Sequence, residues 1–154
     1  MEVREYRPED CREMGELFLY TVRTVNRRDY TEEETKAWAP GLPDLERWNR
    51  SFLDHYTLVA WECGRIAGFG DIDRTGYLDR LYVGRDFQGR GIATAICGRL
   101  EEHFPVERVT VCASITARPF FEGRGYRVLQ AQKVLRRGVY LTNFVMEKRF
   151  GESG

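Results

Sequence analysis

The stretch from Leu81 to Thr94 constrains the fold of this chain more than any other part of the sequence. A run of residues typical of a β-strand ends in a turn that contains Gly89 and Gly91, and this turn leads directly into an amphipathic helix. Glycine lets the backbone approach a ligand closely, and the first N–H groups of a helix have no internal partner and carry partial positive charge. The order of strand, glycine turn and helix therefore predicts an anion site that suits a pyrophosphate.

The sequence around the turn excludes two common kinds of phosphate site. The pattern G-x-x-x-x-G-K-[ST] of the P-loop nucleotide-binding proteins is absent, and so is the dinucleotide-binding pattern G-x-G-x-x-G. No acidic residue ends a second strand in a dinucleotide-type unit. Taken alone, the turn at Gly89 and Gly91 is equally consistent with a strand–helix connection that binds no ligand.

Hydrophobic periodicity and turn residues predict helices and strands along the whole chain. Strands are predicted at 3–6, 57–62, 65–73, 77–83, 109–114, 126–135 and 140–148, and helices at 8–25, 88–104 and 116–124, with short helices after Thr31 and Asp44. Hairpins combined with crossover helices predict the α+β class, with a central mixed, mostly antiparallel sheet of about seven strands and helices on both faces. We expect a single domain at 1–150 and a disordered tail at 151–154.

Composition narrows the class of partner. The chain has 24 basic and 24 acidic residues, and this balance disfavours a nucleic-acid partner. No apolar stretch approaches the roughly 20 residues that span a bilayer, so we expect no membrane partner. No apolar run follows Met1, which argues against a secretory signal. The four cysteines form no C-x-x-C pair or Cys/His cluster, so we expect no metal site, and reduced thiols in a cytoplasmic protein.

Two motifs in register resemble the GNAT acetyltransferase family. The first, Gln88-x-x-Gly91-x-Ala93 after a strand, resembles that family's pyrophosphate loop. The second, Ser114-x-x-Ala117-x-x-Phe120-Phe121-Glu122-x-x-Gly125-Tyr126, resembles its second cofactor segment, usually written N-x-x-A-x-x-F-Y-E-x-x-G-F. A helix and a strand separate the two, the order of elements matches from Val3 to Lys148, and the chain looks most similar to the YafP-like bacterial branch. The resemblance implies a GNAT-like fold and acetyl-coenzyme A as acyl donor.

The resemblance also implies which residues bind the cofactor. The strand Leu81, Tyr82 and Val83 would pair with the pantetheine arm, and the Leu81 N–H would lie near the thioester carbonyl. The backbone N–H groups of Gly89, Arg90, Gly91, Ile92, Ala93 and Thr94 would hold the pyrophosphate, with the side chains of Gln88 and Arg90 at its rim. An ordinary solvated arginine is an equal alternative for Arg90. Ser114 stands where the family usually has Asn, and its reach is shorter.

The second segment departs from the family at the group that protonates the leaving thiolate. Phe121 stands where many members have Tyr, and phenylalanine has no proton to donate, so only cofactor contact is implied for it. A thiolate with a pKa near that of cysteine, about 8.5, can leave unassisted or take a proton from water. Tyr126, Tyr140 and Cys112 are substitutes in principle, each with core packing as the alternative, and Tyr126 is our candidate.

The acceptor amine must lose a proton before it attacks, so a base is expected. Alternation along the strand predicts that Tyr77, Asp79, Leu81 and Val83 share one face. The resemblance implies a base on this strand a few residues before the loop, which makes Asp79 the leading candidate, with Asp71 and Asp73 behind it. The alternative for Asp79 is an ion pair with Arg80 or another arginine.

The remaining candidates are less closely specified. His55 and His103 lie near predicted helix ends, where histidines usually face solvent or complement the helix dipole. The acceptor pocket of this fold would draw on Tyr20, Asn26, Tyr30, Trp38, Trp48, Tyr140 and Asn143, with core packing favoured for Trp38 and Trp48. The resemblance implies an N-acetyltransferase that acts on a primary amine of a small molecule or peptide within a ternary complex. The alternative is a catalytically impaired acyl-coenzyme A binding or sensing module, and either would be a monomer or homodimer.

Overall fold

A computed structural model describes residues 1–150 and contains one seven-stranded sheet in the order β1-β2-β3-β4-β5-β7-β6. The strands are β1 (Glu2–Glu5), β2 (Tyr56–Glu62), β3 (Arg65–Ile72), β4 (Tyr77–Val83), β5 (Arg108–Ser114), β6 (Arg127–Arg136) and β7 (Val139–Arg149). Only β4 and β5 run parallel; every other neighbouring pair is antiparallel. The predicted α+β class is confirmed. The tail expected at 151–154 lies outside the described residues.

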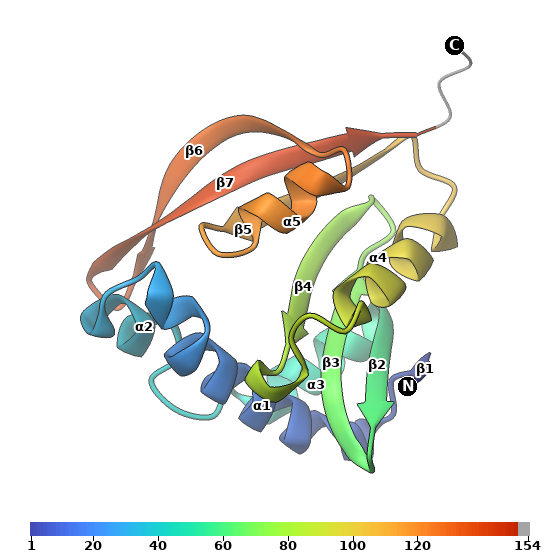
Figure 1. The fold of residues 1–154 in the computed structure, drawn as a ribbon, viewed down its shortest axis with the longest axis horizontal. Helices are drawn as coiled ribbons and strands as arrows, with labels where there is room; N and C mark the ends of the chain where they lie inside the picture. Colours follow the sequence, from blue (N-terminus) through green and yellow to red (C-terminus); the bar gives the residue numbers. More distant parts are fainter. Residues whose placement is uncertain (151–154) are drawn as a thin grey trace.

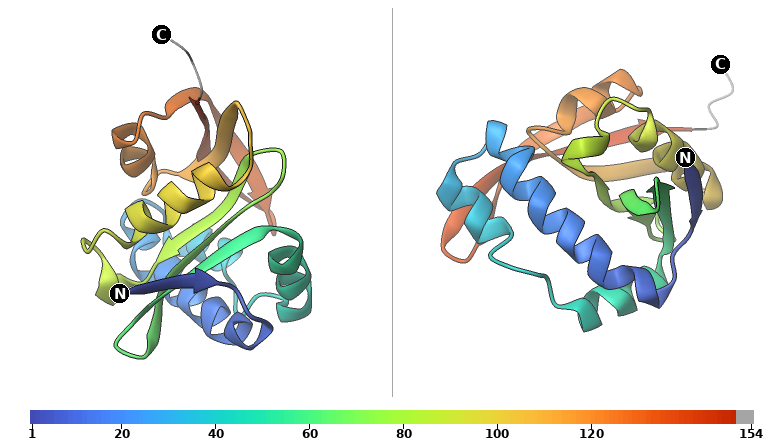
Figure 2. Two further views of the ribbon diagram at one scale, coloured as in Figure 1. Left: turned by 90° about the vertical axis from the view of Figure 1, so that its right-hand side faces the viewer. Right: turned by 60° about the horizontal axis from the view of Figure 1, so that its bottom comes forward.

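The helices cover both faces of the sheet, as Figures 1 and 2 show. They are α1 (Cys11–Thr24), α2 (Glu32–Trp38), α3 (Leu45–Asp54), α4 (Ile92–His103) and α5 (Arg118–Gly123). One core cluster joins α1 and α3 to β2 and β3 through Phe18, Phe52 and Phe69. A second cluster joins α4 and α5 to the other face through residues such as Ile96 and Phe121. The middle of the sheet around β3 is therefore buried on both sides, whereas β6 at its edge is mostly exposed.

Local sequence signals fix where α2 and α3 begin. Thr31 Oγ1 accepts a hydrogen bond from the Glu34 N–H at 3.1 Å, and the Glu34 carboxylate accepts one from the Thr31 N–H at 2.8 Å, so α2 starts with the predicted capping box. Asp44 caps α3 through the Arg47 N–H at 3.2 Å. The helix predicted from residue 88 begins only at Ile92, because the residues before it form a turn with positive φ angles.

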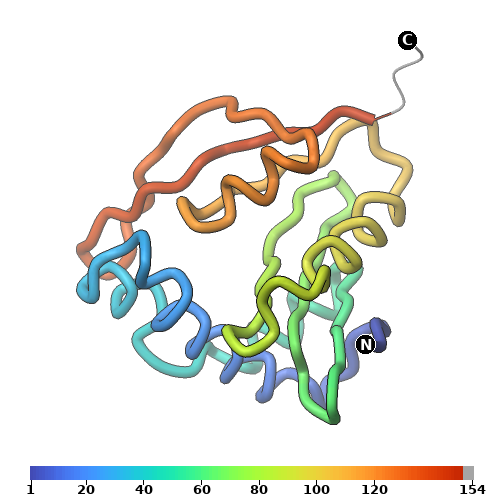
Figure 3. The backbone as a smooth tube through the Cα atoms, viewed as in Figure 1, coloured from blue at the N-terminus to red at the C-terminus, as the bar shows by residue number. Residues whose placement is uncertain are grey.

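The parallel strands β4 and β5 diverge soon after they meet, and the trace in Figure 3 can be followed through this divergence. They pair only at Tyr77 with Thr110 and at Leu78 with Val111. Beyond Leu78, β4 continues to Val83 beside β3, while β5 continues beside β7. The edge of β4 that faces β5 is therefore left without a partner strand in the described part of the chain.

A β-bulge interrupts β4 at Asp79. Ile72 of β3 pairs with Leu78 while Asp71 pairs with Arg80, so Asp79 is the extra residue. Leu78 and Leu81 therefore both face the α4 core, although an odd number of positions separates them. The prediction that Tyr77, Asp79, Leu81 and Val83 share one face is wrong beyond Asp79, because strict alternation does not hold across a bulge.

Candidate active site

Two cavities adjoin at the divergence of β4 and β5. The first has a volume of about 200 Å³, and its lining includes Leu81, Val83, Gln88, Ala93, Ala117 and Phe121. The second has a volume of about 170 Å³, and its lining includes Tyr30, Trp38, Tyr77, Leu141, Thr142 and Asn143. Three side chains line both cavities: Asp79, Cys112 and Ser114. Molecules bound in the two cavities would meet at these three residues.

The glycine turn before α4 has the geometry of an anion cradle. Gly89 and Gly91 have φ angles of +75° and +78°, which side chains rarely adopt, and a Cβ added to either would meet no atom within 4 Å. Gly91 caps α4 without a side-chain cap, and the first helical bond runs from the Ala95 N–H to the Gly91 carbonyl at 3.0 Å. The N–H groups of the preceding turn therefore have no helical partner. Open space beside free donors fits a phosphate group.

The residues predicted to bind the cofactor divide into two sets. Seven of them line the first cavity: Leu81, Tyr82, Val83, Gln88, Ala93, Ser114 and Phe121. The others, Gly89, Arg90, Gly91, Ile92 and Thr94, belong to the adjoining turn and helix start. The side chain of Ile92 is buried in the core, which leaves only its backbone for a ligand.

The polar side chains of the turn are held by protein partners. Gln88 Nε2 donates to the Val83 carbonyl at 2.6 Å, so the side chain folds back over the turn. A guanidinium nitrogen of Arg90 lies 3.3 Å from a Glu62 carboxylate oxygen, and the guanidinium carbon lies 5.6 Å from the centre of the Phe87 ring. Arg90 is thus directed by Glu62 and Phe87, and neither alternative from the sequence included these contacts.

The second predicted segment forms a wall of the first cavity. Ser114 Oγ accepts from the Ala117 N–H at 3.0 Å, which closes the turn before α5 and leaves its own O–H to donate. Phe121 is buried and packs against Tyr126, with ring centres 5.0 Å apart. Phe121 has no hydroxyl group, so this wall of the cavity is apolar at the position where many family members have a tyrosine.

The structure corrects the assignment of Tyr126 as proton donor. Tyr126 is 4% exposed, lines neither cavity, and donates its hydroxyl proton to Glu101 Oε2 at 2.7 Å. Burial, with Cys97 and Glu101 nearby, raises the pKa of Tyr126 well above its usual value. Tyr126 is therefore a core residue. Tyr140 is exposed and lines neither cavity, whereas Cys112 lines both and accepts from Gln132 Nε2 at 3.6 Å.

Asp79 lies where the two cavities meet, and its side chain is 32% exposed. One of its carboxylate oxygens lies 3.6 Å from an Arg80 guanidinium nitrogen, so the predicted alternative of an arginine pair is present together with the cavity position. Asp73, predicted as a fallback base, lines neither cavity. Its Oδ1 accepts from the Thr75 N–H and hydroxyl and from the Tyr77 N–H, which closes the turn before β4.

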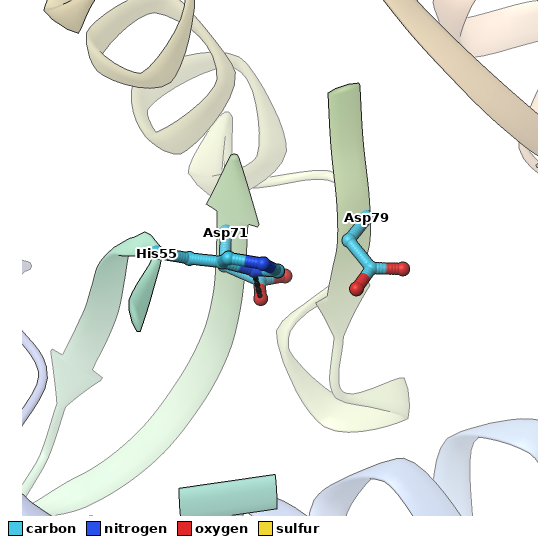
Figure 4. Close-up of side chains that lie close together, drawn as sticks. All are labelled: His55, Asp71 and Asp79. Atoms are coloured by element: carbon cyan, nitrogen blue, oxygen red, sulfur yellow. Dashed lines mark hydrogen bonds and ion pairs between the residues drawn. The ribbon is translucent and has the colours of Figure 1, made fainter. Parts of the chain in front are cut away.

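Behind Asp79 lies a cluster that sequence reasoning missed. His55 Nδ1 lies 2.8 Å from Asp71 Oδ2, and one ring nitrogen of His55 and one oxygen each of Asp71 and Asp79 lie within 4.8 Å of one another. Figure 4 shows His55 and Asp71 in contact, with Asp79 facing them from the neighbouring strand. Asp71 is the one charged residue inside the otherwise apolar stretch Ile66–Ile72, and this was the signal that could have found the cluster.

Arginine and burial set the electrostatics of this cluster. Asp71 is fully buried and accepts a second hydrogen bond from Arg80, whose guanidinium also donates to Ser51 Oγ at 3.1 Å. Burial pushes the pKa of Asp71 upward, while the hydrogen bond from His55 and the charge of Arg80 pull it down. The hydrogen bond to Asp71 raises the pKa of His55.

His55, Asp71 and Asp79 are also the kind of group that holds a metal ion. The guanidinium of Arg80 already supplies positive charge at Asp71, so a second cation would be repelled there. We therefore assign no metal to this cluster, and the expectation of a metal-free protein stays a prediction.

The predicted acceptor residues are only partly brought together. Tyr30, Trp38 and Asn143 line the second cavity, and Asn26 lines the first. Trp38 also packs against Tyr30, so cavity lining and packing coincide there. Trp48 packs in the core against Phe18 and Phe52, as favoured from the sequence. Tyr20 and Tyr140 are exposed and line neither cavity.

A free helix N-terminus at one cavity and an acidic side chain shared with a second define a two-ligand site of the kind used for group transfer. A family model described as the acetyltransferase (GNAT) domain matches residues 26–148. The chain belongs to the GNAT acetyltransferase family and is an acyltransferase, as the two motifs predicted.

Individual relatives agree with this assignment. The chain is 33% identical over 147 residues to a protein of Escherichia coli K12 named "Uncharacterized N-acetyltransferase YafP", covering 95% of this chain and 94% of that one. It superimposes on a GCN5-related N-acetyltransferase from Rhodopseudomonas palustris with a TM-score of 0.92 and 31% identity, covering 97% and 95% of the two chains. PaiA N-acetyltransferase from Thermoplasma acidophilum, solved with coenzyme A, has the same fold at a TM-score of 0.77 and 17% identity, with coverage of 97% and 98%. Within residues 1–150, no helix is both long and apolar enough to cross a membrane.

Proposed function

We propose that this protein transfers the acetyl group of acetyl-coenzyme A to a primary amine of a small molecule or peptide, by direct attack while both are bound. The observation that carries the proposal is the meeting of the two cavities at Asp79, with the glycine turn beside the first. Family membership supports the acetyl donor, and the coenzyme A bound by PaiA supports the ligand class.

The first cavity would take the donor. The N–H groups of the turn from Gly89 to Thr94 suit the pyrophosphate, and the open edge of β4 from Leu81 to Val83 suits the pantetheine arm. Thr116 Oγ1 is buried beside this cavity without a protein partner, so a polar ligand group there would satisfy it. The Leu81 N–H is our candidate to stabilise the negative charge that develops on the thioester oxygen.

The second cavity would take the acceptor. Its aromatic and aliphatic lining suits an amine with an apolar body, and Asp79 would attract the ammonium end. Asn143 Oδ1 is buried there without a partner within residues 1–150 and would accept a hydrogen bond from the amine nitrogen. We assign Asp79 as the group that first receives the proton of the amine.

The proton balance of the reaction fixes what the protein must do. An ammonium ion loses two protons when it becomes an amide: a bond forms between its nitrogen and the acetyl carbon, and the carbon–sulfur bond breaks. The departing sulfur takes one proton and leaves as the thiol. The other proton goes to solvent, because nothing else in the reaction consumes it. Since Phe121 is no donor, Cys112 and water remain as sources of the proton for the sulfur.

The proposal is tested by thiol release from acetyl-coenzyme A with polyamines, amino acids, aminoglycosides, peptides and arylamines. We expect at least one primary amine to give thiol and acetylated product in equal amounts. Thermal stabilisation by acetyl-coenzyme A, measured in the same preparation, separates the alternatives. Stabilisation without thiol release across the panel would favour the impaired binding module, to which Phe121 points, and absence of stabilisation would reject both.

The remaining expectations belong to this proposal. A cytoplasmic location and the absence of a nucleic-acid or membrane partner rest on composition alone. The protein would act as a monomer or homodimer.

A further inference from the structure

We infer that His55, positioned by Asp71, receives the proton that the acceptor amine gives to Asp79 and delivers it to solvent. The inference rests on the proposed acetyl transfer and adds its proton exit. Asp79 is the one carboxylate among the residues that line the two cavities, whereas His55 and Asp71 line neither. Asp79 thus lies at the cavities and the pair His55–Asp71 lies behind it. Figure 4 shows the three side chains together.

The contact with Asp71 selects the form of His55 that accepts a proton at its outer nitrogen. A carboxylate beside Nδ1 accepts a hydrogen bond from it, so a neutral His55 carries its proton on Nδ1 and a lone pair on Nε2. Within residues 1–150, Nε2 has no protein partner, and the side chain is 15% exposed. His55 therefore has Nδ1 fixed by Asp71, Nε2 free of protein partners within residues 1–150, and a ring that is partly exposed.

The support behind His55 is rigid. Asp71 is fully buried and held by Arg80, and Arg80 is in turn held by Ser51 and by the rings of Trp48 and Phe52, whose centres lie 5.1 Å and 4.7 Å from its guanidinium carbon. A relay needs a fixed tautomer and a fixed ring, and these contacts supply both. His55 caps the C-terminus of α3, which adds a favourable dipole for its protonated form.

The distance between Asp79 and His55 suits transfer through water. One ring nitrogen of His55 and one oxygen of Asp79 lie within 4.8 Å of each other, and within residues 1–150 no direct hydrogen bond joins the two side chains. One water molecule can bridge such a separation. A carboxylate alone is a poor final holder for a proton from an amine, because its pKa lies well below the working pH. Histidine titrates near neutral pH and can pass the proton on.

The charged groups around His55 set the pH at which the relay works. Asp71 and Asp73 face it from β3 and the turn that follows, and Asp79 and Arg80 face it from β4. The hydrogen bond to Asp71 and the charge of Asp79 raise the pKa of His55, while burial and Arg80 lower it, with a net rise. Only neutral His55 accepts a proton, so the rate should increase with pH through the pKa of this residue.

A nuclear magnetic resonance titration tests the relay without any acceptor. The chain has two histidines, so the ¹⁵N-labelled imidazoles of His55 and His103 give a simple spectrum, and His103, stacked on Tyr56, is an internal control. We expect neutral His55 to carry its proton on Nδ1 and to titrate above about 6.5. In Asp79→Asn the pKa of His55 should fall, because the charge of Asp79 helps to raise it. The inference would be overturned if neutral His55 carried its proton on Nε2, or if the pKa of His55 were the same in Asp79→Asn as in wild type.

Kinetics with two amines distinguish a relay from a structural role. Benzylamine is mostly protonated at neutral pH and must lose a proton before attack, whereas aniline is already neutral. We expect His55→Gln to lower kcat/KM for benzylamine by about tenfold to a hundredfold and to remove the part of the rise with pH that follows the titration of His55, leaving the part that follows the amine itself. The loss with aniline should be under about threefold, and His103→Gln should behave as wild type.

Three outcomes would contradict the relay. Equal losses with both amines would make His55 structural, and an unchanged pH profile in His55→Gln would exclude it from proton transfer. Loss of activity after treatment with a metal chelator would make the cluster a metal site instead. Failure of the wild type to bind acetyl-coenzyme A would count against the proposed function. If the protein acetylates neither amine, the titration still tests whether His55 has the protonation that the relay requires.

Discussion

Each face of the sheet carries a buried carboxylate that an arginine holds, and the two clusters differ in how completely the carboxylate is bonded. Glu101 of α4 accepts from Arg124 on both oxygens, from the Tyr126 hydroxyl and from Cys97 Sγ. Asp71 of β3 accepts from Arg80 and His55 on Oδ2, and within residues 1–150 its Oδ1 has no protein partner. We call the cluster around Glu101 closed, because both carboxylate oxygens are bonded, and the cluster around Asp71 open, because one oxygen is not.

The difference teaches where to look for chemistry among buried charges. A saturated carboxylate has no capacity left for a ligand or a moving proton, so its role is to hold the elements around it together. An unsaturated one beside a titratable histidine and a cavity can hold a group whose charge changes. Burial and an arginine partner are common to both clusters and do not discriminate between them.

The largest effect that this comparison predicts is on stability at the closed cluster. Glu101→Ala leaves Arg124 without its partner and Tyr126 with an unbonded hydroxyl, so the free energy of unfolding should fall by about 3 kcal/mol. Urea unfolding followed by circular dichroism measures the change. Acetylation per folded molecule should stay at the wild-type rate. A variant that is stable but slow would show that the closed cluster takes part in the reaction.

The next effect falls on the rate rather than on stability. Asp79→Asn removes the proposed first proton acceptor, so kcat for an alkylamine should fall by about a hundredfold, equivalent to about 2.7 kcal/mol. The free energy of unfolding should change by less than about 0.5 kcal/mol, because the carboxylate is partly exposed. Asp73→Asn is the matched control, and a larger loss of rate there than in Asp79→Asn would reverse the assignment.

The part of the site that could be predicted from sequence is the part made by consecutive residues. The glycine turn, the strand before it and the helix after it carry their chemistry in the backbone, so their order along the chain was enough to place Gly89 and Gly91 at a free helix N-terminus. The seven strands and their class followed in the same way, from alternation and turn residues.

The open cluster could not be predicted because its members come from three separate elements. His55 ends α3, Asp71 lies in β3 and Asp79 in β4, and a bulge that alternation does not foresee sets the direction of Asp79. The prediction that Tyr126 is the proton donor failed for the opposite reason. Its place in a cofactor motif suggested chemistry, but its hydroxyl turns into the core, where only the fold brings Glu101 within reach.

A smaller effect tests that correction of Tyr126. Tyr126→Phe removes one buried hydrogen bond to a charged group, so the free energy of unfolding should fall by about 1.5 kcal/mol. The rate of thiol release should stay within about twofold of wild type, because the hydroxyl reaches neither cavity. Thermal unfolding and steady-state kinetics on the same sample measure both quantities. A large loss of rate with little loss of stability would restore Tyr126 as proton donor.

The smallest effect is the pH dependence of stability, which should have opposite signs at the two clusters. The pKa of His55 is raised by its bond to Asp71, so its contribution is complete below about 6.5 and is lost as the pH rises through the higher folded value. Burial opposes ionisation of Glu101, but Arg124 and Tyr126 lower its pKa, so its contribution is lost as the pH falls through that lower value.

Urea unfolding between pH 5 and pH 9, a range of about four units around the usual pKa of histidine, measures the contribution of His55 to stability. Wild type should lose stability relative to His55→Gln as the pH rises, and the difference should become independent of pH once His55 is neutral in both folded and unfolded chains. His103→Gln is the matched control for the loss of a histidine. Parallel curves for wild type and His55→Gln would mean that the bond to Asp71 does not favour the protonated ring, and the contrast between the open and the closed cluster would then reduce to geometry alone.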